Sequence, residues 1–164
     1  MRESNKKMYH LAHGAMIAAV YVALTVAFAP ISFGAIQFRV SEALCILPYF
    51  TPAAVPGLFA GCFLSNLMLG SPWDMVFGSL ATLIGAAGSW YLRRHKWCVC
   101  LPPILSNAII IPWVLRYAYG SPDLIPVTMV TVGIGEVLAV GVLGNVLMVT
   151  LERYKNLVFK QQAA

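Results

Sequence analysis

Acidic side chains within long apolar stretches are the residues of this sequence best suited to chemistry. Glu136 lies well inside the apolar stretch 126–151. A charged group within a membrane costs free energy and by default marks a function. We therefore expect Glu136 to bind a ligand. The alternative is a structural role, in which Glu136 pairs with Arg116 or Asn107 of the stretch 98–117.

Three polar residues precede or open the stretch 40–50. Glu42 follows Arg39 by one helical turn, so the two side chains can form an intrahelical ion pair, which is worth only about 0.2–0.5 kcal/mol when exposed. Alternatively, Gln37, Arg39 and Glu42 form an outer lid that closes over a ligand, since loops commonly carry binding groups. The sequence leaves both interpretations open.

Asp74 and two amide side chains are further candidates for ligand contact. Asp74 lies at the start of the stretch 73–92, where an acid interacts favourably with the helix dipole, so a capping role must be weighed first. Asn66 and Asn107 lie in apolar surroundings. Hydrogen bonds between helices are the first expectation for such amides, and ligand contact is the second.

Two tryptophans lie near the ends of apolar stretches on the side that we assign to the exterior. Trp73 and Trp113 are typical of an aromatic belt that anchors helices at the membrane interface. A flat ligand would also stack well against such rings. We therefore include both among the candidate substrate contacts, with belt anchoring as the default.

Catalytic and metal-binding signatures are missing from the sequence. No G-x-x-x-x-G-K-[ST] motif is present, so we do not expect the chain to hydrolyse ATP itself. His10 and His13 lie one helical turn apart, but the only acid near them is Glu3, and zinc would need further ligands. We expect no catalytic residue, no bound metal and no cofactor.

The distribution of basic residues predicts how the chain is threaded through a membrane. Lys and Arg collect in loops on the cytoplasmic side, so an even number of crossings should separate the basic clusters. Both termini are then cytoplasmic. The basic residues border apolar stretches rather than forming a separate basic face, which argues against nucleic-acid binding. Nine of the eleven Lys and Arg residues form three clusters: Arg2, Lys6 and Lys7; Arg93, Arg94 and Lys96; Arg153, Lys155 and Lys160.

Composition and length predict an all-α membrane protein. Apolar residues make up 60% of the chain and charged residues 10%, and about 20 residues are needed per membrane helix. The second and third predicted spans are short, so together they form either two crossings or a re-entrant hairpin. We expect one domain, residues 1–164, a six-helix transmembrane bundle with short cytoplasmic tails (1–9 and 153–164) and spans at 11–31, 40–50, 56–69, 73–92, 98–117 and 126–151.

A stripe of small residues runs along the first predicted span. Alanines recur there at strict four-residue spacing, at Ala15, Ala19, Ala23 and Ala27. Small residues let helices approach closely in lipid, where packing drives association. We interpret the stripe as a docking face for another protein. The alternative is an alanine-rich span with no special partner.

Several longer stretches resemble a known family. They are QFRVSEAL at 37–44, LP at 47–48, TPAAVPGL at 51–58 and DMVFGSLATL at 74–83. Together with the alanine stripe and the six-span layout, these stretches resemble the QueT family of queuosine-precursor transporters, which are substrate-binding (S) components of energy-coupling factor (ECF) transporters. The resemblance covers nearly the whole chain.

The resemblance implies a multi-pass protein of the bacterial plasma membrane that captures a 7-deazaguanine, such as 7-aminomethyl-7-deazaguanine or queuine, from outside. A separate transmembrane coupling subunit and two ABC-type ATPases would then drive release inside, so ATP is used by partners and not by this chain. In S components the pocket generally opens outward. Carried onto this sequence, that implies the loop around Gln37 and Arg39, Asp74, and the fifth and sixth spans.

A guanine-like edge suggests how the candidate residues would bind. It offers a ring N–H beside an exocyclic amino group, and one carboxylate can accept both. We expect Glu136 in this role, Asn107 or Asn66 on the carbonyl side, and Glu42 or Asp74 offsetting a cationic aminomethyl group. The alternatives are an S component for another vitamin or small nutrient, a small membrane enzyme using His10 and His13, and an oligomeric channel.

Overall fold

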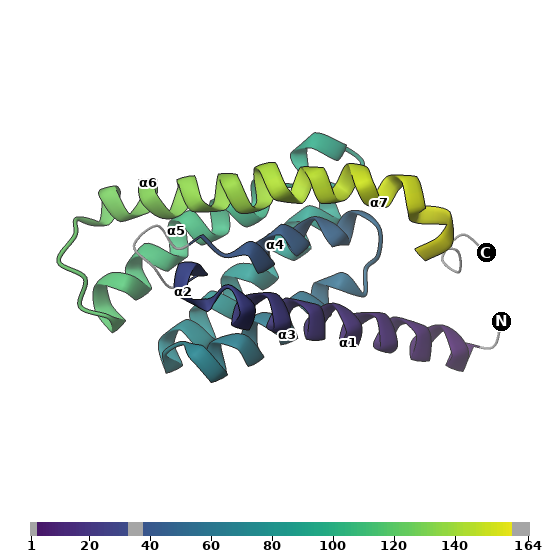
Figure 1. Cartoon of the computed structure of the whole chain (residues 1–164), viewed down its shortest axis with the longest axis horizontal. Coiled ribbons are helices and arrows are strands. Elements are labelled where there is room, and N and C mark those ends of the chain that lie inside the picture. The colour runs from purple at the N-terminus through teal and green to yellow at the C-terminus, as the bar shows by residue number, and fades with distance from the viewer. Residues whose placement is uncertain (1–2, 33–37, 159–164) are drawn as a thin grey trace.

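The computed structural model describes residues 3–32 and 38–158 of the chain, with side chains from 7–32 and 38–154 (Figure 1). Within these ranges all the regular structure is helical. The prediction of an all-helical protein is therefore confirmed for the described part. Gln37, one of the predicted site residues, lies outside it.

The described ranges contain seven α-helices and four short 3-10 or π-helical segments. The 3-10 segments are η1 (Val40–Tyr49) and η3 (Lys96–Cys98), and the π-helical segments are η2 (Asp74–Gly78) and η4 (Val137–Gly144). The α-helices are α1 (Glu3–Ala27), α2 (Ala29–Ser32), α3 (Ala54–Leu69), α4 (Ser79–Tyr91), α5 (Leu101–Ala118), α6 (Ile125–Glu136) and α7 (Asn145–Val158).

The chain runs back and forth along the long axis of the molecule. The first turn of α1 and the last turn of α7 lie at the same end (Figure 1). Helix α1 packs on α3, α3 on α4, α4 on α5 and α5 on α6. The segment η1 lies at the centre, where it contacts η4 and α4. Eight consecutive residues of η1, 41–48, are buried.

Among the described residues, three helical stretches are long and apolar enough to cross a membrane: Lys7–Ala27, Lys96–Ala118 and Ile125–Tyr154. The ten residues of η1 and the sixteen of α3 span only about 20 and 24 Å, at about 2.0 and 1.5 Å per residue. Both fall short of the roughly 30 Å of a bilayer core. The count of six crossings and the sides of the termini therefore stay predictions.

The first predicted span differs from the observed helix. The span was expected at 11–31, whereas α1 ends at Ala27 and the single turn α2 follows. Proline has no backbone N–H and its ring clashes with the carbonyl four residues earlier, so Pro30 cannot continue the hydrogen-bond pattern of α1. At the other end, α1 begins at Glu3, so the helix extends well beyond its apolar part.

Glycines let α1 and α3 approach each other closely. A Cβ added to Gly57 would lie 2.6 Å from the carbonyl oxygen of Gly14, and one added to Gly61 would lie 2.7 Å from Cβ of Tyr21. Small residues four apart are typical of close helix pairs in membranes. This contact turns the ring of Tyr21, which is 1% exposed, toward the centre of the molecule.

The opposite face of α1 carries the alanine stripe. Ala15, Ala19, Ala23 and Ala27 are all exposed. Large apolar side chains are exposed on other helices as well, for example Leu67 on α3, Ile109 on α5 and Val130 on α6. A surface of this kind fits lipid, because large apolar patches are rare on proteins that face water.

Candidate functional site

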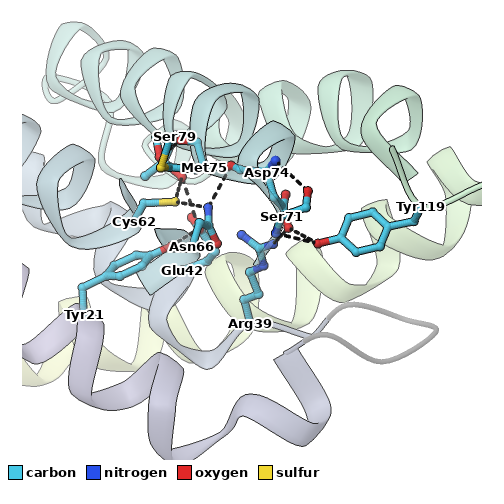
Figure 2. A network of polar contacts seen from close by, with 11 residues as sticks. Tyr21, Arg39, Glu42, Cys62, Asn66, Ser71, Asp74, Met75, Ser79 and Tyr119 are labelled. Atoms are coloured by element: carbon cyan, nitrogen blue, oxygen red, sulfur yellow. Dashed lines mark hydrogen bonds and ion pairs between the residues drawn. The ribbon is translucent and has the colours of Figure 1, made fainter. Parts of the chain in front are cut away.

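Glu42 forms the centre of a buried polar cluster. The side chain comes from the first turn of η1 and is 1% exposed. The hydroxyl of Tyr21 on α1 donates to Oε1 of Glu42 (Figure 2). Thr82 of α4 donates to the same oxygen at 3.3 Å, and Cys45 donates to Oε2 at 2.9 Å. Three elements therefore hold one carboxyl group, and each of its oxygens has a protein donor.

A buried ion pair lies at the end of this cluster that we predict to face the exterior, which we call the outer end. Nη2 of Arg39 lies 3.1 Å from Oδ2 of Asp74, and the two side chains are 5% and 1% exposed. Tyr119, which follows α5, donates its hydroxyl to the same oxygen at 3.3 Å. The backbone N–H of Ser71 donates to that hydroxyl at 3.1 Å. Residues from three separate parts of the chain, at 39, 71–74 and 119, thus meet at one point (Figure 2).

Asn66 links the ion pair to the region around Glu42. Its amide nitrogen donates to the backbone oxygen of Asp74 at 3.0 Å and to Sγ of Cys62 at 3.4 Å. The hydroxyl of Thr82 lies 3.3 Å from that same sulfur, so the Cys62 thiol can donate to it while Thr82 donates to Glu42. Gly78 leaves room for this arrangement, because a Cβ there would lie 3.0 Å from Nδ2 of Asn66.

Glu136 reaches the cluster from the last long helical stretch. It is 3% exposed and ends α6, directly before the π-helical segment η4. Asn107 of α5 is buried as well, and Asn107, Glu42 and Arg39 are all near enough to act on the carboxyl group electrostatically. π-Helical turns are rare and frequently mark functional sites. Here one of them follows Glu136 and the other, η2, begins at Asp74.

The structure brings together most of the predicted site residues. Arg39, Asn66, Asp74, Asn107 and Glu136 join Glu42 in the interior.

Two predicted contacts lie apart from the polar cluster. Trp73 and Trp113 are 59% and 46% exposed. They line an outward-facing apolar groove of about 380 Å³, together with Phe77 and Tyr117. This position fits the interpretation as belt anchors more directly than ligand stacking within the cluster.

Two of the arginine partners considered from the sequence make other contacts in the structure. Arg116 was considered as a partner for Glu136, but its Nη1 donates to the backbone oxygens of Ser121 and Asp123 at 2.9 and 3.4 Å. Arg39 was considered as a partner of Glu42 within one helix. It forms its ion pair with Asp74, which is 35 residues away in the sequence.

The three residues that donate to Glu42 were not predicted: Tyr21, Cys45 and Thr82. Tyr21 could have been found, because it lies with Thr25 on the face of α1 opposite the alanine stripe. A polar pair four residues apart on the inward face of a membrane helix indicates a buried hydrogen-bonding site. Cys45 and Thr82 gave no comparable signal, since small, weakly polar residues are common inside helical bundles.

Helical architecture, membrane-length apolar helices and a buried cluster of charged groups define an all-helical membrane protein with a polar interior. A model of a family described as QueT transporter matches residues 11–153. The chain therefore belongs to the QueT transporter family, and the predicted resemblance is confirmed.

One curated relative and the solved structures complete the comparison. The queuosine precursor transporter QueT of Lactococcus lactis subsp. cremoris (strain MG1363) is 38% identical to this chain over 80 residues. These residues are 48% of this chain and 47% of the relative, so the match spans about half the length of each. No solved structure matches the chain.

Proposed function

We propose that this protein is the substrate-capture (S) component of an ECF-type importer in the bacterial plasma membrane, and that it binds a queuosine precursor from outside. Its membership of the QueT transporter family supports the transport role. The observation that carries the proposal is the Glu136 carboxyl group, which is buried in an interior that it shares with other polar and charged side chains. Charged groups in that position mark substrate pathways in membrane proteins.

The composition of the cluster supports a ligand of the 7-deazaguanine class. The Glu136 carboxylate can accept the ring N–H and the exocyclic amino group of a guanine-like edge together. Three acidic residues, Glu42, Asp74 and Glu136, share the interior with Arg39. A cationic aminomethyl group, as in 7-aminomethyl-7-deazaguanine, would offset this excess of acidic groups, because buried charges need partners.

The surface of α1 supports the proposed partners. Its four stripe alanines are exposed, so a transmembrane coupling subunit can approach the helix backbone closely there. The sequence contains no nucleotide-binding loop, and two ABC-type ATPases would supply the energy through that subunit.

Ligand-dependent thermal unfolding of the purified protein tests the substrate. We expect 7-aminomethyl-7-deazaguanine or queuine to raise the melting temperature, with a stabilisation of about 2.7 kcal/mol when the ligand is present at 100 times its Kd. A panel of vitamins serves as the control. Stabilisation by one of these vitamins and by neither deazaguanine would instead indicate an S component for another nutrient.

Co-purification tests the partners separately from the substrate. Ala19→Leu places a bulky side chain in the middle of the stripe and should abolish recovery of a coupling subunit and ATPases with this chain. Ala87→Leu, at an exposed alanine of α4, is the matched control and should leave recovery unchanged. Recovery of this chain only with copies of itself would contradict the S-component assignment and favour a channel.

A further inference from the structure

The acidic groups of the cluster differ in how many protein donors they already have. Glu42 accepts from Tyr21, Thr82 and Cys45, so both of its oxygens are engaged. Oδ2 of Asp74 accepts from Arg39 and Tyr119. Oε2 of Glu136 is buried, and within the described residues no donor reaches it. Of these carboxyl groups, Glu136 therefore has an oxygen to offer to a ligand.

Asn66 offers a second acceptor of the same kind. The backbone oxygen of Asp74 can only accept a hydrogen bond, so the NH2 side of the Asn66 amide must face it. Nδ2 of Asn66 lies 3.0 Å from that oxygen. That orientation fixes Oδ1 on the other side of the amide. Oδ1 is buried, and no donor among the described residues reaches it. Asn66 is 1% exposed, so bulk water does not satisfy this oxygen either.

The NH2 group of Asn66 is already in use. It faces the backbone oxygen of Asp74 and Sγ of Cys62. In this arrangement Asn66 does not present its NH2 group to a ligand carbonyl. This differs from the expectation that Asn66 could donate there, and it leaves Asn107 for that role.

A buried acceptor without a donor is costly, and native proteins leave few of them. Two such oxygens occur in one cluster here, whereas the hydroxyls of Tyr21 and Thr82 and the thiol of Cys45 are directed to Glu42. We infer that Glu136 and Asn66 determine specificity as paired acceptors, so that the site selects ligands with separate N–H donor groups. A purine analogue without its exocyclic amino group is then rejected.

Glu42 has a different part in this arrangement. It is a positioning residue, which holds Tyr21, Cys45 and Thr82 around the site and does not touch the ligand. The inference deepens the proposed function and rests on it, because it assumes that a deazapurine enters this cluster.

Two ligands that differ in one group test the inference on the wild-type protein. 7-Deazaguanine carries the exocyclic amino group and 7-deazahypoxanthine lacks it. We expect the wild type to bind 7-deazaguanine more tightly by a factor on the order of 100, because a site built around a hydrogen bond rejects the analogue that cannot form it. Isothermal titration with each purine measures this ratio and requires no mutation.

Isosteric variants then show which residue causes the preference for 7-deazaguanine over 7-deazahypoxanthine. In Glu136→Gln, one acceptor oxygen becomes a donor, and the preference for 7-deazaguanine should fall to less than about threefold. In Glu42→Gln, the displaced neighbours should lower the overall affinity, but the preference should stay near its wild-type value. Loss of the preference in Glu42→Gln alone would overturn the division of roles.

Asn66 has a matched control elsewhere in the chain. Asn145 also has a buried Oδ1 without a donor and an NH2 group bound to a backbone oxygen, that of Gly141 at 2.5 Å, but it starts α7 and lies outside the cluster. We expect Asn66→Leu to weaken binding of 7-deazaguanine about tenfold or more, and Asn145→Leu to change it less than about twofold.

The outcomes separate this inference from the proposed function. If neither purine nor any queuosine precursor binds, the proposed substrate and the inference both fail. If 7-deazaguanine binds but the wild type binds 7-deazahypoxanthine equally well, the substrate class stands and the inference is overturned. A preference that persists in Glu136→Gln overturns it as well.

Discussion

Two ion pairs at opposite ends of η1 use the same chemistry in different surroundings. At the outer end, Arg39 and Asp74 are 5% and 1% exposed. At the other end, Lys96 pairs with Glu152 of α7, and both side chains are 29% exposed. The second pair lies beside Tyr49, whose hydroxyl donates to Glu152 at 3.1 Å. Burial, rather than the residue types, is what separates the two pairs.

The difference indicates different roles. A partly exposed pair, such as Lys96 and Glu152, keeps part of its hydration and contributes little to stability. A buried pair has lost its hydration, and removal of one partner leaves the other charge in an apolar interior. The outer pair also connects loops that are far apart in the sequence, since Tyr119 and Ser71 join it. The inner pair attaches the basic loop at 93–96 to the last helix.

Removal of Asp74 should have the largest effect. In Asp74→Ala, the guanidinium of Arg39 loses the carboxylate that balances it, and the free energy of unfolding should fall by about 3–5 kcal/mol. Denaturant unfolding of the purified protein in detergent measures the change. Asp123→Ala, in the exposed loop after α5, is the control and should unfold like the wild type. Equal stability of Asp74→Ala and wild type would contradict a structural role for the pair.

Replacement of both charges sharpens the same point. The double variant Arg39→Met with Asp74→Leu removes both buried charges at once, so most of the stability lost in Asp74→Ala should return. Thermal unfolding in detergent, with the two single variants alongside, gives the coupling between the residues. A double variant as unstable as the sum of the two singles would show that the charges act independently.

Removal of the Tyr119 hydroxyl should have an intermediate effect. Tyr119→Phe deletes the donor to Asp74 and the acceptor for Ser71, and hydrogen bonds of this kind contribute about 0.5–1.5 kcal/mol each. Tyr117→Phe is a close control, because Tyr117 lies two residues before Tyr119, near the end of α5, and is 78% exposed. Melting temperatures of the two variants should differ clearly. Identical values would remove Tyr119 from the outer network.

Removal of the inner ion pair, Lys96 with Glu152, should have the smallest effect on stability. Lys96→Ala should lower the free energy of unfolding by no more than about 1 kcal/mol, because both side chains are partly hydrated and Tyr49 still donates to Glu152. Raising the salt concentration should shrink even this effect, since salt screens partly exposed charges. The effect of Asp74→Ala should change little with salt. A large, salt-independent loss in Lys96→Ala would break the contrast between the two ends.

The sequence could predict that certain polar residues share the interior. Glu136, Asn66 and Asn107 stand in apolar stretches, and buried polar groups must find partners, so their convergence follows from physics. The particular pairs could not be predicted. Arg39 has Glu42 one turn away, yet it pairs with Asp74 on another element, and only the packing of η1 against its neighbours decides between them.

The local geometry of the helices could not be predicted from the sequence either. The stretch 40–50 was expected as a membrane helix, but η1 is a 3-10 helix with Pro48 inside it. In the last long stretch, Glu136, Val140, Gly144 and Met148 are all buried at four-residue spacing. In an ideal α-helix each such step overshoots a full turn by about 40°. The wider turns of η4 absorb this overshoot, which keeps the four residues on one face.

Helix α1 has no such correction along its alanines, because it is α-helical from Glu3 to Ala27. The row formed by Ala15, Ala19, Ala23 and Ala27 is therefore inclined by about 26° to the helix axis. A partner helix that fits its own four-residue ridge beside this row would cross α1 obliquely, at about 50°. The two helices would then diverge on either side of a short crossing point, instead of running alongside each other as a coiled pair.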